Sequence, residues 1–218
     1  MQRFLFLIKP LVFLACLIPL TRLGWGFWQD ALGANPIEAL TRGLGTWALN
    51  FLLITLAITP ARKLLGLPWL GRLRRLLGLY AFFYGLLHLL SYLWLDQFFV
   101  LQDIARDILK RPFITAGMAA FVLLVPLAVT SNNYAIRRLG GKRWNELHRT
   151  VYAIGLLALL HYAWLVKLDI TKPVIYGLIL AALLGIRVFW RYRESVRQRA
   201  GAYPKKNGRR IIPIVVKR

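Results

Sequence analysis

The sequence predicts an all-α integral membrane protein, a bundle of six transmembrane helices, and three observations carry that prediction. Of the 218 residues, 58% are hydrophobic and only 17% are charged, whereas soluble domains average about 45–50% and about 25%. Six apolar runs reach or approach the ~20 residues that span a bilayer. The basic residues cluster between these runs, a pattern typical of the loops of membrane proteins.

The six expected helices follow one another along the chain. The first run has a basic start but no small-residue cleavage site at its end, so it is interpreted as a retained helix and not as a secretory signal. The runs together form one domain, 1–190, and the basic tail, 191–218, is interpreted as an anchor on anionic lipid. The runs are 4–21, 43–60, 76–95, 113–130, 148–166 and 173–190.

The loops differ in charge, and this difference predicts the orientation. The loops after the second and fourth runs and the tail are rich in Lys and Arg, whereas the loops after the first and third runs also hold acids. Cytoplasmic loops carry the excess of basic residues, so both termini are expected in the cytoplasm. The basic loop residues are Arg62, Lys63, Arg72, Arg74, Arg75, Arg137, Arg138, Lys142 and Arg143, with ten more in the tail.

Composition also excludes several classes of protein. Such high hydrophobicity excludes intrinsic disorder. The net charge of +22 would suggest nucleic acid in a soluble protein, but the loop clusters explain it, so no nucleic-acid partner is expected. With Cys16 as the one cysteine, the sequence allows no disulfide, no covalently attached c-type haem and no Cys-rich zinc site.

All three histidines, His88, His148 and His161, lie on predicted helices. A single histidine within a membrane helix is often a hydrogen-bonded core residue. The placement of all three histidines on helices instead favours a role as metal ligands, since neutral imidazole binds haem iron. At 1.5 Å per residue, His88 lies about 18 Å along the third run and His161 about 20 Å along the fifth. These two share a depth in the outer half of the membrane and can bind one haem from both sides.

His148 is expected at the inner rim, away from the other two histidines. At 100° per residue, the 13-residue spacing turns His148 and His161 about 140° apart on a straight helix. A bend or a π-bulge is needed to make them face the same way. His148 is therefore a candidate for a separate role, as a cap or a propionate contact.

Two alternatives to a haem protein come from other classes, a small transporter or channel and a cofactor-free membrane scaffold. All eight carboxylates lie in or beside loops. Ion-coupled transporters usually keep such groups within the membrane, so this distribution counts against a transporter. The placement of every histidine on a helix counts against a scaffold.

The Trp-Asn-Glu-Leu-His-Arg-Thr-Val-Tyr block at 144–152, with a second histidine 13 residues after the first, resembles the ferric-reductase-type transmembrane superfamily. That superfamily includes NADPH oxidases and metalloreductases. Within it, residues 1–200 resemble the MsrQ (formerly YedZ) family of haem-binding membrane subunits. Residues 35–38, 59–62 and 74–78 agree with this resemblance.

The resemblance implies a function as an electron-transfer subunit that is not itself the catalytic one. Members of this family pass electrons across the bacterial inner membrane from the quinone pool or a cytosolic flavin reductase. The acceptor is a soluble periplasmic molybdopterin-containing partner, MsrP, which reduces methionine sulfoxide in periplasmic proteins and forms a heterodimer with the membrane subunit. Haem b and FMN are the cofactors that the resemblance implies.

The chain departs from the four-histidine pattern of the superfamily. A partner for His148 would lie 13 or 14 residues before His88, where Arg75 and Arg74 stand. Arginine is always charged and is a poor metal ligand, so one bis-histidine haem is expected and a second stays open. Arg74 and Arg75 can pair with a haem propionate or a flavin phosphate, or simply anchor the cytoplasmic edge. The sequence has no Gly-rich βαβ unit for NADPH, so electrons must come from a quinol or another protein.

Overall fold

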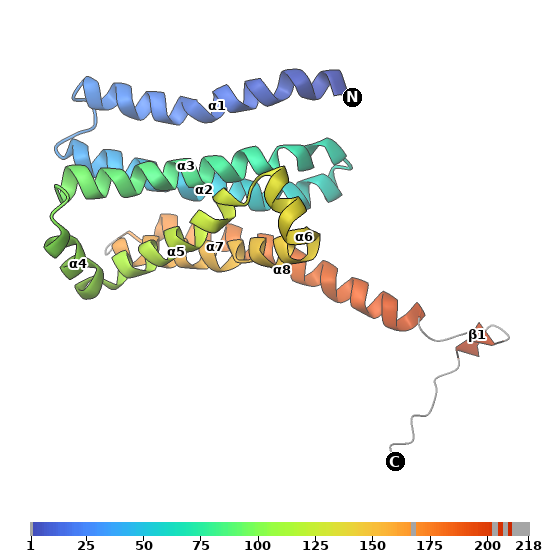
Figure 1. Cartoon of the computed structure of the whole chain (residues 1–218). Helices are drawn as coiled ribbons and strands as arrows, with labels where there is room; N and C mark the ends of the chain where they lie inside the picture. Colours follow the sequence, from blue (N-terminus) through green and yellow to red (C-terminus); the bar gives the residue numbers. More distant parts are fainter. Residues whose placement is uncertain (1, 167–168, 202–204, 207–208, 211–218) are drawn as a thin grey trace, which may run out of the picture.

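The computed structural model describes residues 2–166, 169–201, 205–206 and 209–210, and it is helical apart from two short strands near the C-terminus (Figure 1). The long helices lie side by side as a bundle, and this confirms the predicted fold class. The helices are α1 Gln2–Trp28, α2 Pro36–Leu64, α3 Arg74–Ser91, α4 Leu101–Lys110, α5 Pro112–Val129, α6 Asn133–His148, α7 Val151–Leu165 and α8 Thr171–Gly201. The shorter elements are the 3₁₀ helix Pro68–Arg72, the π-helix Tyr92–Asp96 and the antiparallel strands β1 Lys205–Lys206 and β2 Arg209–Arg210.

Among the described residues, five helices are long and apolar enough to cross a membrane: α1, α2, α3 with its π-helical end, α5 and α8. The remaining predicted span, the fifth run at 148–166, corresponds to α7, which has 15 residues and therefore a length of about 22 Å. A bilayer core is about 30 Å thick. Helix α7 nevertheless packs against α2, α5 and α8 as part of the bundle. The predicted count of six spans is therefore approximate.

Two connections that the apolar pattern assigns to loops are helical. Both are too polar to appear as membrane spans, but local interactions stabilise them. In α4, side-chain ion pairs link residues one turn apart, such as Arg106 with Asp103 at 3.5 Å. In α6, the Asn132 side chain caps the first turn through the Ala135 N–H at 2.7 Å. Gly140 has a φ of +75°, which divides α6 into two helical pieces across a kink.

The helix boundaries also differ from the apolar runs at two places. His148 is the last residue of α6, and Arg149 and Thr150 form a turn before α7 begins at Val151. The turn at 149–150 therefore separates His148 from the helix that carries His161. Helix α8 continues unbroken to Gly201 and projects from the bundle (Figure 1). The division at residue 190 thus marks a change in composition inside a helix, and it stays a prediction.

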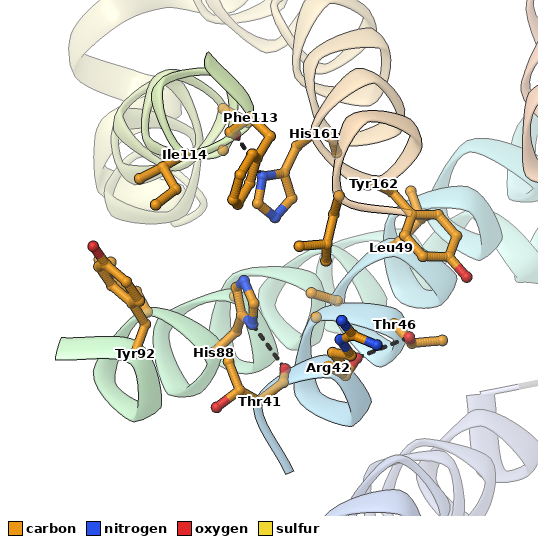
Figure 2. A pocket seen from close by; sticks show the side chains of 18 of the residues that line it. Thr41, Arg42, Thr46, Leu49, His88, Tyr92, Phe113, Ile114, His161 and Tyr162 are labelled. Atoms are coloured by element: carbon orange, nitrogen blue, oxygen red, sulfur yellow. Dashed lines mark hydrogen bonds between the residues drawn. The ribbon is translucent and has the colours of Figure 1, made fainter. Parts of the chain in front are cut away.

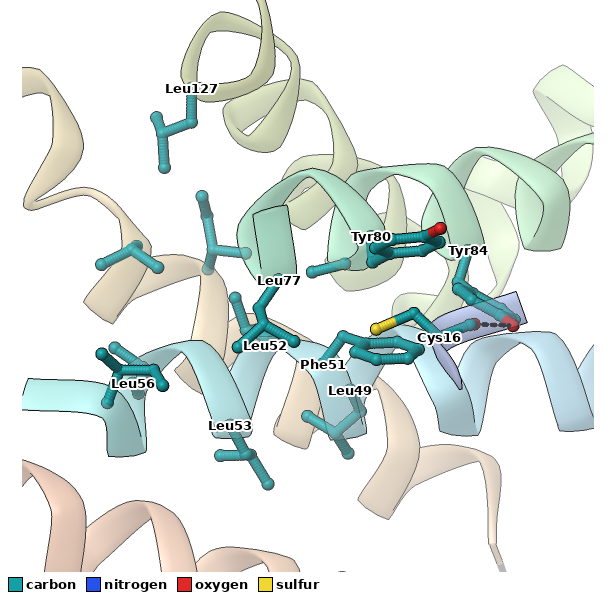
Figure 3. Packing of buried hydrophobic residues seen from close by; sticks show 14 of the residues in the cluster. Cys16, Leu49, Phe51, Leu52, Leu53, Leu56, Leu77, Tyr80, Tyr84 and Leu127 are labelled. Carbon is teal, nitrogen blue, oxygen red and sulfur yellow. Dashed lines mark hydrogen bonds between the residues drawn. The ribbon is translucent and has the colours of Figure 1, made fainter. Parts of the chain in front are cut away.

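The bundle is built from two helix pairs, α2 with α3 and α5 with α7, and the pairs face each other. Buried apolar side chains from α2 and α3 form the centre of the core (Figure 3). Phe51 of α2 stacks on Tyr84 of α3 with ring centroids 5.2 Å apart. Leu56 and Ile154 are 1% and 2% exposed and bring α2 against α7. This packing fixes the distance between the α2/α3 pair and the α5/α7 pair, and the cavity described below lies between these pairs.

Helix α1 lies at the edge of the bundle and is attached by tyrosine hydroxyls from α3 (Figure 1). The fully buried Tyr84 hydroxyl accepts from the Leu20 N–H at 3.0 Å and donates to the Cys16 carbonyl at 2.8 Å. These two backbone groups are four residues apart, so the hydroxyl occupies the place of a helical hydrogen bond. Tyr80 likewise donates to the Phe13 carbonyl at 2.8 Å. Both contacts attach α1 to α3, and the Tyr84 contact does so in place of a backbone hydrogen bond.

Arg187 attaches α8 to α2 in a similar way. Its guanidinium donates to the Leu56 carbonyl and, at 2.6 Å, to the Leu183 carbonyl of its own helix. The helical partner of the Leu56 carbonyl would be the N–H of residue 60, but residue 60 is proline and has none. Arg187 therefore supplies the donor that Pro60 lacks.

Candidate functional site

A cavity of about 710 Å³ lies between the α2/α3 and α5/α7 pairs. It lies at one end of the bundle, which we call the cavity end. At this end the chain passes from α1 to α2, from α3 through α4 to α5, and from α7 to α8. We call the opposite end the basic end. There the chain passes from α2 to α3 and from α5 through α6 to α7. Pockets of about 300–1,000 Å³ bury most of a ligand of drug size, so the cavity can accommodate a large planar cofactor.

His88 from α3 and His161 from α7 face each other across this cavity (Figure 2). Their ring centroids are 6.0 Å apart and their planes are inclined by 70°. His88 Nδ1 lies 2.8 Å from the Thr41 carbonyl oxygen, and His161 Nδ1 lies 2.6 Å from that of Phe113. Because a carbonyl oxygen can only accept, each Nδ1 carries the proton and donates it. In the neutral imidazole each Nε2 is then unprotonated, and the two Nε2 atoms point toward one another (Figure 2).

This geometry suits one metal ion held between two imidazoles. Two metal–nitrogen bonds of about 2.0 Å, with about 1 Å from each ring centre to its Nε2, span about 6 Å. Among the residues described here, no three His, Cys, Asp or Glu side chains converge to hold a metal. The pair therefore fits a metal whose other ligands come from a macrocycle, as in haem. The Thr41 hydroxyl, buried and without a hydrogen-bond partner in the cavity wall, adds a polar atom that a bound group could satisfy.

The rim of the cavity is polar and carries charges of both signs. Arg42 pairs with Glu38 at 2.5 Å, and Asp169 and Lys172 lie on the α8 side. Hydrogen bonds from Thr171 lower the pKa of the Asp169 carboxyl below its usual range, so this carboxyl is ionised. The rim thus offers cations for acidic groups of a cofactor and anions that balance them.

His148 lies elsewhere, at the basic end, and does not line the cavity. Its ring stacks on Trp144 with centroids 3.7 Å apart, and Nδ1 donates to the Trp144 carbonyl at 3.0 Å. Nε2 is buried without a hydrogen bond of normal geometry, although the Leu127 backbone interacts with the ring. Burial lowers the pKa of His148 below its ordinary value, so the imidazole is neutral.

Arg74 and Arg75, at the start of α3, are also found at the basic end. Arg75 donates to the Asn133 side-chain oxygen at 2.8 Å and so links α3 to α6. Arg74 is close enough to His148 to act on its charge. The structure therefore brings His88 and His161 together, and His148 with Arg74, at opposite ends.

Nothing in the sequence singles out the residues that orient the two cavity histidines. The acceptors are main-chain carbonyls of Thr41 and Phe113, whose positions depend on how α2 and α5 pack. The glycines beside the two rings, Gly45 and Gly117, resemble any other glycine in an apolar run until the helices are assembled.

Residues 43–159, more than half of the chain, match the family described as ferric reductase like transmembrane component. A relative from Azospira oryzae is 60% identical over 201 residues, which cover 92% of this chain and 84% of the relative. Relatives from Herminiimonas arsenicoxydans and Rhodospirillum rubrum are 53% and 55% identical and cover 89% and 88% of this chain and 90% and 91% of their own. All three are named protein-methionine-sulfoxide reductase heme-binding subunit MsrQ.

The helical bundle and the family match define the class, a membrane protein with a ferric-reductase-like transmembrane domain. The similarity to the three relatives extends over nearly the whole chain, from spans to loops. The chain belongs to the MsrQ family.

Proposed function

We propose that this chain is a haem b electron-transfer subunit in which His88 and His161 would together hold the iron of one haem. The observation that carries the proposal is the pair of imidazoles, fixed through Nδ1 and 6.0 Å apart across a cavity of suitable size. The names of the relatives as heme-binding subunits support the same cofactor.

Haem iron supplies a one-electron couple when it is bound, and the chain determines how that couple is used. The carbonyls of Thr41 and Phe113 hold each imidazole in the tautomer that ligates through Nε2 and raise its basicity. If both histidines held the iron, they would leave no place on it for a substrate. Apolar side chains such as Leu52, Leu124 and Ile154 line the inner part of the cavity. Two histidine ligands and an apolar inner lining would favour electron transfer over catalysis at the iron.

The proposed donor is a quinol of the bacterial inner membrane or a cytosolic flavin reductase. The proposed acceptor is MsrP, the periplasmic molybdopterin-containing methionine-sulfoxide reductase with which this subunit would form a heterodimer. FMN is a further proposed cofactor, with Arg74 and Arg75 as candidates for its phosphate. The relatives' description as subunits of a protein-methionine-sulfoxide reductase supports this route.

The route requires both termini in the cytoplasm and the cavity end toward the periplasm. The support is the concentration of Lys and Arg in the loops of the basic end. We expect a cytoplasmic reporter fused after Arg218 to be active and a periplasmic reporter there to be silent. A periplasmic reporter placed between α4 and α5, after Lys110, serves as the control and should be active. Reversed activities would contradict the orientation.

We propose a separate role for His148, as ligand of a second haem or as a contact to a propionate or flavin phosphate with Arg74. His148→Ala should retain the low-spin spectrum of the cavity haem. Reduction from the cytoplasmic side should fall by about 10-fold or more, the scale on which loss of a cofactor contact acts. The measurement is stopped-flow reduction in proteoliposomes, with the exposed neighbour Asn145→Ala as control. Loss of all haem from folded His148→Ala protein would show that the assignment of ligands is wrong.

A cofactor-free transporter or membrane scaffold is the alternative. The visible spectrum of the purified full-length protein separates it from the proposal. We expect a b-type spectrum on reduction and a haem content of at least one per chain. A folded, colourless preparation that takes up no added haem would support the alternative.

A further inference from the structure

Building on the proposed haem function, we infer that Gly45 and Gly117 are positioning residues, each forming half of a notch that docks one ligand imidazole. The two notches have the same construction. His88 lies against α2 at the Thr41 carbonyl and Gly45, and His161 lies against α5 at the Phe113 carbonyl and Gly117. In both, the glycine follows the accepting residue by four positions.

The distances show how little room each notch leaves. A Cβ added at Gly117 would lie 2.7 Å from His161 Nδ1 and 3.0 Å from its Cε1. A Cβ at Gly45 would lie 3.0 Å from His88 Nδ1 and 3.1 Å from its Cε1. Real Cβ atoms essentially never approach closer than 3.0 Å. Any side chain at position 117 must therefore displace the ring, and one at position 45 must press on it.

Helix geometry explains why the glycine is at the fourth position. In an α-helix the carbonyl of residue i accepts from the N–H of residue i+4, and its second lone pair stays available. An imidazole from a neighbouring helix reaches that lone pair beside residue i+4, where a side chain would block it. Glycine is unfavourable inside a helix, so access to the carbonyl gives a reason for its presence at both notches.

Other glycines of the bundle lack this arrangement. A Cβ at Gly78 of α3 would make only an ordinary contact, 3.6 Å from the Thr55 methyl group. A Cβ at Gly85 would lie 3.7 Å from Leu124. Among the glycines that the structure describes, close approach to an imidazole is thus specific to the two notches. Gly78, which does not line the cavity, serves as a matched control.

The notch sets two properties of the ligand. It fixes the ring orientation, and it holds Nδ1–H on a carbonyl, which makes the imidazole a stronger donor to the metal. A stronger donor stabilises the ferric state. Loss of the hydrogen bond should therefore raise the midpoint potential, a change that a purely structural effect on the fold would not produce.

The test compares Gly117→Ala, Gly45→Ala and Gly78→Ala in the purified full-length protein. We measure haem affinity, the midpoint potential, the ferric EPR signal and the thermal stability of the haem-free form. We expect Gly117→Ala to weaken haem binding by about 10–100-fold, raise the potential and change the g values, with a smaller effect for Gly45→Ala and none for Gly78→Ala. The haem-free form should change little in stability, because the gain in helix propensity from alanine offsets the displacement of the ring.

Wild-type affinity, potential and g values in Gly117→Ala would overturn the inference. If that variant does not fold, Gly45→Ala decides: a raised potential supports the notch, and wild-type values overturn it. A wild-type protein that binds no haem contradicts the proposed function instead, so the two failures are distinguishable.

Discussion

Replacing His161 by alanine should abolish the low-spin haem, and His88→Ala should do the same. Each variant removes one of two nitrogens that point at the same place, 6.0 Å apart between ring centroids, and among the described residues no third His, Cys, Asp or Glu converges on them. Even outer partners of a ligand are worth about 10–100-fold in affinity, so loss of the ligand itself should cost more. Haem content per purified chain and the reduced spectrum measure this.

His148→Ala is the matched control because it removes an imidazole from the basic end, away from the cavity. Gel filtration should show that all three variants remain folded. A wild-type low-spin spectrum in either cavity variant would contradict the pairing.

Arg187→Met should lower the free energy of unfolding by about 1–3 kcal/mol, the cost of leaving a buried carbonyl unsatisfied. The carbonyl is that of Leu56, which loses its helical donor at Pro60. Thermal unfolding in detergent measures the change, and the exposed Arg191→Met, one turn further, is the control.

A second substitution tests the physical reason. Pro60→Ala restores an N–H to the Leu56 carbonyl, so the Arg187→Met, Pro60→Ala double variant should lose less stability than Arg187→Met alone. Equal or additive losses would mean that Arg187 stabilises the bundle through other contacts, such as its position 5.9 Å from the centre of the Tyr152 ring.

Hydropathy predicted the long helices because a helix that crosses the bilayer must be apolar along its whole length. It could not detect α4 or α6, whose stability comes from ion pairs, caps and contacts with the bundle. It also joined His148 to the fifth run, because the turn at 149–150 has no Gly or Pro to mark it.

The shared depth of His88 and His161 could be predicted from helix rise and orientation alone. Their mutual orientation could not, because it depends on carbonyls and glycines contributed by two other helices. Arg187 was not predicted for the same reason: its partner, the carbonyl left free by Pro60, lies 131 residues away along the chain. Such contacts become visible only when the helices are assembled.

The central claim is that one iron is held between His88 and His161, and low-temperature EPR of the ferric protein tests it most directly. The experiment uses His148→Ala protein, in which the cavity pair is the remaining source of histidine ligands. Imidazole planes inclined by 70° leave the iron d orbitals nearly degenerate, so we expect a highly anisotropic low-spin signal. With ¹⁵N-labelled histidine, pulsed EPR should detect two coupled imidazole nitrogens. A high-spin signal, or a single coupled nitrogen, would contradict the claim.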